Sequence, residues 1–567
     1  MKNYIPRPVS IAKTMLSNLR ALRKDRLLLS ILLMSLILRF WGLSYGFPFH
    51  YPPDESVLVK ESLVLPFRGF NPGHFDWPHL QYYLTFVVFS PIYLVQKFMG
   101  TAPQNLDGPL LAYFFAARAI SVVTGTITIL LTYLFAKRLF SREVGLLAAL
   151  FLSLNSAHLA QSQLATLDIT LTMWLMVFFL SLIPNLTKPA LKTYAMSGFL
   201  LGLATSTKYN AGFAFIIILF IHAFNFASWK KPQTKSEVAL FVKGLGGFFH
   251  NIKWVLVSAI MALVGFCIGT PFALIDFKTF VSSETPKGAL WQFVHVGSNS
   301  YQGGIMEHYW GLLKTLIAEP LSWPLFILAI LGGMRLFKSK SPAKYLVLPF
   351  SILYFLYVGQ FQLTPIHYYL PLFPLLSILA ALGLLIIIKS LNTFFKISSS
   401  KLKFASYLIT LIIMAPLLIT TIINRYVILQ KDTRTQAYEW IGQNIPKDQG
   451  IVMGNDYEPD LTGSGYKLYS IYDFLLNEDL SRPIYPKFND RNIHYGVLGD
   501  FDLAKRYDDS SWDPGKPNYP DYLLSEAKVV KRFDPKFRPG PTVMIFEIAY
   551  DYEVKRLHKN QDQANDK

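Results

Sequence analysis

Long apolar runs separated by short basic clusters fill residues 27–424 of this chain. A run of about 20 apolar residues is long enough to cross the hydrocarbon core of a bilayer as a helix. Of the 567 residues, 52% are hydrophobic and only 16% are charged. The pattern therefore predicts an α-helical polytopic membrane protein.

The apolar part divides into about 11 transmembrane helices. We predict these spans near residues 27–44, 112–135, 144–162, 166–184, 195–207, 211–227, 254–270, 320–334, 345–358, 367–388 and 404–424. One more apolar stretch, 80–98, is left out because counting it would invert the charge pattern that follows. Its tyrosines suit a helix lying in the outer membrane interface.

The net charge of +18 is distributed unevenly. Residues 1–424 carry 34 basic and 13 acidic side chains, whereas residues 425–567 carry 20 and 23. Lys and Arg accumulate in the cytoplasmic loops of membrane proteins. We therefore assign to the cytoplasm the segments that hold 25 of the 34 basic residues: 1–26, 136–143, 185–194, 228–253, 335–344 and 389–403. The excess charge follows membrane topology and does not indicate nucleic-acid binding.

This topology predicts two domains in a multi-pass cell-membrane protein with a cytoplasmic N-terminus. Residues 1–424 form the transmembrane domain, with external loops 45–111 and 271–310. Residues 425–567 form an extracytoplasmic α/β domain, because "DTRTQAYEWIGQNIPKDQGIVMGN" is typical of an amphipathic helix followed by a turn and a buried strand.

The first external loop contains adjacent carboxylates, Asp54 and Glu55, in "YGFPFHYPPDES". A carboxylate pair at the outer membrane surface could act on a substrate presented from the bilayer. The alternative is that both are solvated loop acids, which are common on protein surfaces.

The order of several motifs resembles a known group. "WGLSYGFPFHYPPDESVLVKESL", "GFNPGHFDWPHLQYYL", "ARAISVVTGTITILLTYLFAKRLF" and "GLATSTKYNAGF" look like polyprenyl-phosphate-sugar-dependent glycosyltransferases of the GT-C fold. This group includes the protein O-mannosyltransferases and the lipid A aminoarabinose transferases. The resemblance implies three kinds of partner: a polyprenyl-phosphate-linked sugar donor, a hydroxyl-bearing acceptor (protein, lipid or glycan) and membrane lipids.

The resemblance also implies roles for particular residues. Asp54, Glu55 and Asp168 are the catalytic candidates: Asp54 and Glu55 occupy the group's "DE" motif, in which the aspartate is catalytic, and Asp168 matches a second external acidic position. Basic and aromatic positions that match the donor phosphate site are Arg118, Lys208, His367 and Tyr368. This chain departs from the group at "WPHL", where His79 replaces a common proline. His79 and Tyr82 are candidates for acceptor or substrate contacts.

The chemistry of sugar transfer suits these residue types. A carboxylate can take the proton from an acceptor hydroxyl as it attacks the anomeric carbon, and cations can stabilise the departing phosphate. A single base and a direct attack by the acceptor hydroxyl predict that the configuration at the anomeric carbon is inverted. No cofactor is assigned with certainty. A divalent metal held by His74, His79 and a carboxylate stays open, without ligand spacing to support it.

Simpler interpretations of the same residues stay open. Asp168 could only cap a helix, and Arg118 and Lys208 could only extend from helix ends toward the interface. His367 and Tyr368 could belong to an aromatic belt. A transporter or flippase of lipid-linked sugars is the alternative function, although the sequence lacks the internal repeats typical of transporters.

Overall fold

The protein is described from a computed structural model. It covers residues 25–49, 52–103, 110–226, 249, 251–292, 294, 304–361, 364–395, 399–454, 458–470, 491–499 and 527–548. Within it the chain divides into two compact units. The membrane unit comprises Met1–Leu43 and Asp54–Ile422, and the C-terminal unit comprises Ser44–Pro53 and Ile423–Lys567. Each unit is described separately.

The membrane unit is built of helices. Its longer helices are α2 (Arg26–Phe40), α3 (Pro53–Val64), α4 (Leu80–Phe98), α5 (Leu111–Leu139), α6 (Arg142–Ser153), α8 (Asp168–Leu182), α9 (Leu191–Thr205), α10 (Phe215–Phe226), α12 (Ile252–Gly269), α16 (Ile305–Leu316), α17 (Trp323–Phe337), α18 (Lys344–Gly359), α19 (Phe373–Phe395) and α20 (Ser399–Ile428). Shorter elements connect them: η1 (Leu65–Arg68), α7 (Ser156–Gln161), η2 (Ile183–Leu186), η3 (Tyr209–Ala214), α13 (Phe272–Ile275), α14 (Phe277–Phe280), α15 (Ala289–Trp291), η5 (Ile317–Leu321) and η6 (Ile366–Leu372).

Six helical segments among the described residues are long and apolar enough to cross a membrane: Leu111–Leu139, Asp168–Leu186, Tyr209–Phe226, Ile252–Gly269, Ile366–Phe395 and Phe404–Asn444. The prediction of a multi-pass membrane protein is thus confirmed. The number of 11 crossings and the orientation of the termini stay predictions. The stretch 80–98 forms α4, which is not among the six, and its place in the interface also stays a prediction.

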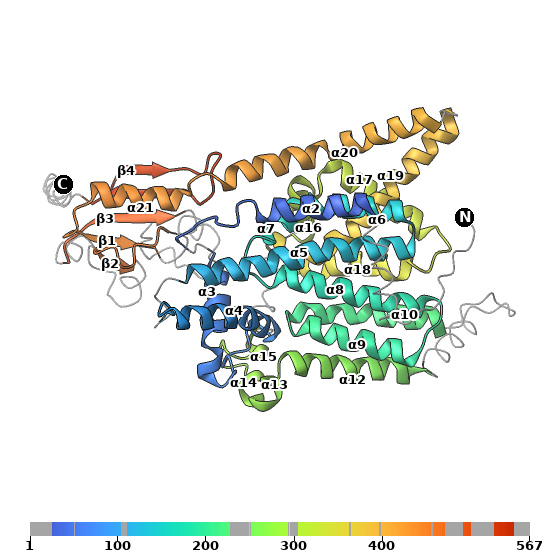
Figure 1. Cartoon of the computed structure of the whole chain (residues 1–567), viewed down its shortest axis with the longest axis horizontal. Helices are drawn as coiled ribbons and strands as arrows, with labels where there is room; N and C mark the ends of the chain where they lie inside the picture. Colours follow the sequence, from blue (N-terminus) through green and yellow to red (C-terminus); the bar gives the residue numbers. More distant parts are fainter. Residues whose placement is uncertain are drawn as a thin grey trace, which may run out of the picture. The chain divides into compact units, whose positions relative to one another are not determined.

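Glycines allow the membrane helices to approach closely. Helices α5, α8, α9 and α12 run side by side (Figure 1). A methyl group on Gly198 or Gly202 of α9 would overlap backbone atoms of α12. The two glycines lie four residues apart on one face, the small-xxx-small spacing that brings membrane helices together.

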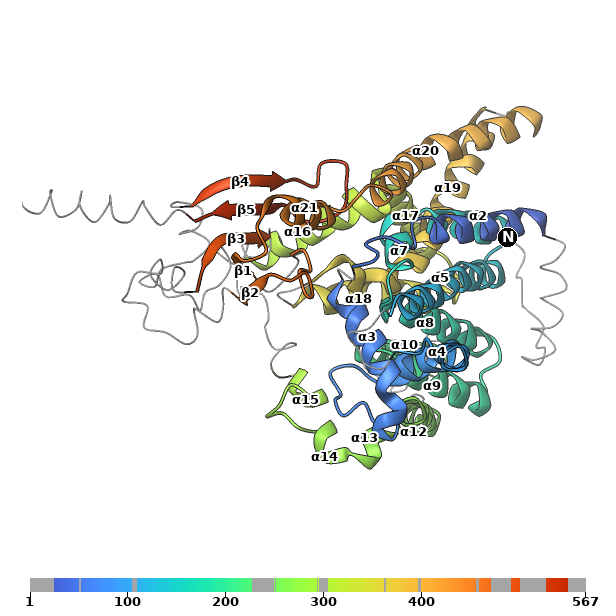
Figure 2. The ribbon, with the colours of Figure 1, turned by 60° about the vertical axis from the view of Figure 1, so that its left-hand side comes forward.

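The C-terminal unit packs α21 (Thr433–Asn444) on a five-stranded sheet. The strands are β1 (Gly450–Met453), β2 (Lys467–Ser470), β3 (Ile493–Gly499), β4 (Lys528–Phe533) and β5 (Val543–Glu547). Figure 2 shows their order, β2-β1-β3-β5-β4. β1 pairs in parallel with β2 and β3, and β5 pairs antiparallel with β3 and β4. Apolar side chains of α21, β1, β3 and β5 form a small core.

The predicted first external loop contains a helix that was not expected from the sequence. Pro53 begins α3, and Asp54 and Glu55 follow in its first turn. Proline suits the first position of a helix, where no backbone N–H is needed, and acidic side chains there interact favourably with the helix dipole. The residues after α3 pack on the segment that follows α12, where Phe75, Ala273 and Ala289 form a small cluster.

Candidate active site

Glu55 and Arg118 form a fully buried ion pair. Arg118 Nε donates to Glu55 Oε1 at 2.8 Å, and Nη2 donates to Oε2 at 2.6 Å. Arg118 Nη1 also donates to the Leu43 carbonyl at 2.8 Å, and the Ala165 backbone N–H donates to Glu55 Oε1 at 2.7 Å. Both side chains are 0% exposed. The pair therefore ties the first turn of α3 to α5 and to the segment before α8.

Asp54 is exposed, unlike its neighbour Glu55. Its carboxylate remains accessible, yet the surrounding protein removes enough water to raise its pKa. The positive charges of Lys208 and His367 oppose this shift, and the negative charges of Asp168 and Glu55 add to it. Asp54 thus shares one electrostatic environment with four of the other predicted site residues.

Asp168 and Lys208 form a second ion pair. Lys208 Nζ lies 2.8 Å from Asp168 Oδ1 and 4.3 Å from the centre of the Tyr368 ring. The Asp168 side chain is 6% exposed and that of Lys208 is 20% exposed, so both side chains lie largely inside the protein. Asp168 is the first residue of α8, and its carboxylate contacts Lys208. The His367 ring packs edge-on to that of Tyr368, with centroids 4.8 Å apart.

Two polar residues beside this pair were missed by the sequence analysis. Asn210 follows Lys208 by two residues, and its amide donates to the Tyr354 hydroxyl at 2.9 Å. The carbonyl oxygen of the Asn210 amide is buried and has no partner within the described ranges. The position of Asn210 in "TKYN" was the only signal available, since Tyr354 lies 144 residues away along the chain.

His74 is held between two carboxylates in the first loop. Its Nδ1 contacts Asp76, and its Nε2 lies 3.5 Å from Glu61, which also pairs with Arg68. Burial alone would lower the pKa of His74, but hydrogen bonds to Asp76 and Glu61 raise it to about 9. His74 is therefore an imidazolium at neutral pH, and the four side chains form a charge-balanced group.

His79 and Tyr82 lie next to this group and are fully buried. His79 Nε2 lies 2.9 Å from the His74 carbonyl oxygen, and its ring stacks on Phe75. Tyr82 packs edge-on against His74, with ring centroids 5.8 Å apart. In the part of the chain that the structure describes, no group of three or more His, Cys, Asp or Glu side chains has the geometry to hold a metal ion.

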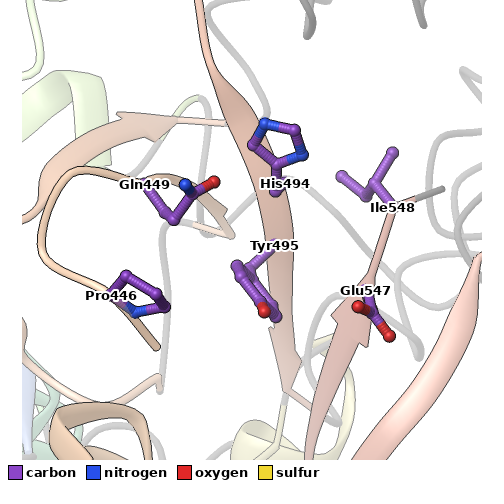
Figure 3. Close-up of a pocket in the computed structure, with 6 residues that line it drawn as sticks. All are labelled: Pro446, Gln449, His494, Tyr495, Glu547 and Ile548. Carbon is purple, nitrogen blue, oxygen red and sulfur yellow. The ribbon is translucent and has the colours of Figure 1, made fainter. Parts of the chain in front are cut away.

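A separate pocket of about 260 Å³ lies in the C-terminal unit (Figure 3). It is lined by Pro446, Gln449, His494, Tyr495, Glu547 and Ile548. None of these residues was predicted to act in catalysis. We assign the candidate active site to the membrane unit, because the predicted carboxylates and cations meet there.

The site therefore offers a proton acceptor and a cation that can bind an anion. Asp54 is an accessible carboxylate whose raised pKa makes it a better proton acceptor. Lys208 is an ammonium group with three N–H donors, of which Asp168 uses one, so it can also bind an anion.

Comparison with known proteins supports the class of fold. Residues 112–254, which include Arg118, Asp168 and Lys208, match the family described as dolichyl-phosphate-mannose-protein mannosyltransferase. The apo crystal structure of the Archaeoglobus fulgidus oligosaccharyltransferase covers 85% of this chain, and the chain covers 70% of it, with 16% identity and a TM-score of 0.52. No curated protein sequence matches significantly.

The chain thus has the fold of the GT-C glycosyltransferases, and the resemblance predicted from the sequence is confirmed at that level. A second similar structure is ArnT from Cupriavidus metallidurans bound to undecaprenyl phosphate. The two share 14% identity over 91% of this chain and 97% of that chain, with a TM-score of 0.48.

Proposed function

We propose that this protein is an integral membrane glycosyltransferase. It moves a sugar from a polyprenyl-phosphate donor to an acceptor hydroxyl at the outer membrane face, with inversion at the anomeric carbon. The observation that carries the proposal is the grouping of Asp54, an accessible carboxylate, with the Asp168–Lys208 pair. The GT-C fold and the match over residues 112–254 support it.

Asp54 is the base in this proposal. The acceptor oxygen forms a bond to the anomeric carbon as the bond from that carbon to the phosphate oxygen breaks. The acceptor proton passes to Asp54, and the lipid phosphate leaves as an anion without needing an acid. Desolvation raises the pKa of Asp54, which increases the affinity of its carboxylate for the acceptor proton.

Lys208 binds the donor phosphate. Asp168 fixes the ammonium group at 2.8 Å, and the Tyr368 ring packs against it. Because the surroundings have a low dielectric constant, a fixed cation stabilises the leaving phosphate more than it would in water. We assign His367 to the same phosphate site, because its ring packs edge-on against that of Tyr368.

We assign to Glu55 and Arg118 the role of positioning the first turn of α3. Glu55 accepts three hydrogen bonds from Arg118 and Ala165, so both of its carboxylate oxygens are already paired within the protein. Their predicted roles, Glu55 in catalysis and Arg118 in phosphate binding, stay predictions that would require this pair to open. We infer instead that the pair fixes the first turn of α3 and thereby the Asp54 carboxylate.

The proposal is tested with purified protein and a panel of polyprenyl-phosphate sugars. Mass spectrometry would follow the loss of sugar from the donor and its gain by hydroxyl-bearing acceptors. We expect turnover of at least one donor. Intact donors throughout the panel, with folded protein and every acceptor class present, would contradict the proposal.

A further inference from the structure

Two buried polar atoms at the start of α4 lack a hydrogen-bond partner among the described residues. They are Nδ1 of His79 and the hydroxyl oxygen of Tyr82. Both side chains are 0% exposed. Buried polar atoms are nearly always paired with protein, water or a ligand, because an unpaired one is costly. The two rings are neighbours, with centroids 6.5 Å apart, and each of the two atoms needs a polar partner.

The protonation of His79 follows from its contacts. Nε2 lies 2.9 Å from the His74 carbonyl oxygen, which can only accept, so Nε2 carries the hydrogen. Burial lowers the pKa of His79 to about 4, so the ring is neutral at pH 7. Nδ1 is consequently a bare acceptor, whereas Tyr82 offers an O–H donor.

A hydroxyl group complements this pair of atoms. It can donate to Nδ1 of His79 and accept from Tyr82. A carboxylate or phosphate dianion cannot donate, and an ammonium group cannot accept. The carboxylates of Asp76 and Asp276 act on His79, and that of Asp54 acts on Tyr82, so the surroundings disfavour an anionic ligand.

An aromatic surface adjoins the same point. The partly buried Trp77 ring lies nearly parallel to Tyr82, at 22°, with centroids 6.2 Å apart. The indole face is a broad apolar platform suited to a flat ring. Burial raises the pKa of Tyr82, and the negative charges of Asp76, Glu61 and Asp54 add to the shift. Tyr82 is therefore within electrostatic reach of the proposed base.

We propose that His79 and Tyr82 bind a second hydroxyl of the acceptor, beside the hydroxyl that Asp54 deprotonates, while Trp77 packs against the acceptor ring. The acceptor is accordingly a carbohydrate with neighbouring hydroxyls and not an isolated serine or threonine of a protein. This inference rests on the proposed transferase function and names its acceptor class.

The test compares two tyrosine variants at saturating donor. Tyr82→Phe removes the unpaired hydroxyl. Tyr83→Phe is the matched control, because the exposed Tyr83 hydroxyl donates to the Phe70 carbonyl at 3.1 Å. The acceptors are a panel of methyl hexosides and a Ser/Thr-containing peptide. We expect the wild type to prefer a hexoside at least tenfold in kcat/KM. Tyr82→Phe should raise the hexoside KM about three- to tenfold with little change in kcat, and Tyr83→Phe should change neither.

Each other outcome has a distinct meaning. Preference for the peptide, or an unchanged hexoside KM in Tyr82→Phe, would overturn the inference while leaving the transferase proposal intact. Lower stability of Tyr82→Phe with an unchanged KM would assign the pair to an ordered water, which also overturns it. Absence of turnover of any donor by the wild type would contradict the proposed function itself.

Discussion

The buried pair between Glu55 and Arg118 gives a quantitative prediction. Arg118→Met keeps most of the side-chain volume but leaves the Glu55 carboxylate buried without its cation. Removing one partner of a buried ion pair typically costs about 3–5 kcal/mol. Since about 1.4 kcal/mol is a factor of ten, the unfolding equilibrium constant should rise by about 10²- to 10⁴-fold.

Arg142 provides a matched control on another helix. It contacts Asp25 through the same two-pronged geometry, at 2.8 and 2.7 Å, but its side chain is 44% exposed. The Asp25 side chain is 9% exposed but keeps a hydrogen bond from the Tyr133 hydroxyl. The arginine end of the pair is open to water, so Arg142→Met should destabilise the protein much less than Arg118→Met. The assay is equilibrium unfolding in detergent micelles, followed by the intrinsic fluorescence of tryptophan.

A double variant separates charge from packing. Glu55→Gln combined with Arg118→Met removes both charges and keeps a carbonyl acceptor for the Ala165 N–H. Replacing both members of a buried pair is often nearly neutral, so most of the lost stability should return. Transfer should nevertheless stay slow, because nothing then fixes the first turn of α3. Equal, small effects of Arg118→Met and Arg142→Met would refute the reasoning.

Three further predictions concern phosphate binding, pH and topology. Lys208→Ala should raise the donor KM at least tenfold with little change in the acceptor KM, measured with each substrate varied separately. The folded pKa of His74, about 9, exceeds its ordinary value of 6.5, so its contribution to stability is complete below about pH 6.5 and is lost as the pH rises through 9. His74→Gln should remove this dependence in unfolding titrations. In a Cys267→Ser background, an impermeant thiol reagent should label Lys467→Cys but not Lys340→Cys in intact cells.

These predictions have controls and contrary outcomes of their own. Lys314, an exposed-face lysine of α16 that lies over Trp310, serves as the control for Lys208, and equal donor KM values in both alanine variants would exclude Lys208 from phosphate binding. Titration of His79 does not overlap with the pH range of this test, because burial lowers the pKa of His79 to about 4. A persistent loss of stability between pH 6.5 and 9 in His74→Gln would place its cause elsewhere. Labelling of Lys340→Cys without labelling of Lys467→Cys would indicate the opposite membrane topology to the one predicted.

Hydropathy was sufficient for the fold class but not for local geometry. The long apolar runs predicted a helical membrane protein, and the apolar helices and the likeness to GT-C structures confirm this prediction. Residues 53–64 lie in the predicted external loop 45–111, where no helix was expected, although Pro53 followed by two acids is a helix start signal. Helix α3 explains why the adjacent carboxylates differ, because its first turn buries Glu55 and leaves Asp54 exposed.

The partners of the site residues could not be read from the sequence. Glu55 and Arg118 are 63 residues apart, and Asp168 and Lys208 are 40 apart. Only the packing of α3 with α5, and of α8 with the start of η3, brings the partners together. Family resemblance suggested which residues matter. It could not indicate that Arg118 is paired with Glu55 or that His79 lacks a partner for Nδ1, because both depend on side-chain packing.

The proposed role of Asp54 as the base is the central claim, and Asp54→Asn tests it most directly. The substitution keeps the shape of the side chain but removes its ability to accept the acceptor proton. The control is Asp460→Asn, where an exposed aspartate accepts a hydrogen bond from the Thr462 N–H and an amide can do the same. With donor loss measured by mass spectrometry, we predict that Asp54→Asn slows transfer by about 10²-fold or more at unchanged stability, while Asp460→Asn has the wild-type rate. A folded Asp54→Asn variant with near-normal turnover would contradict the account.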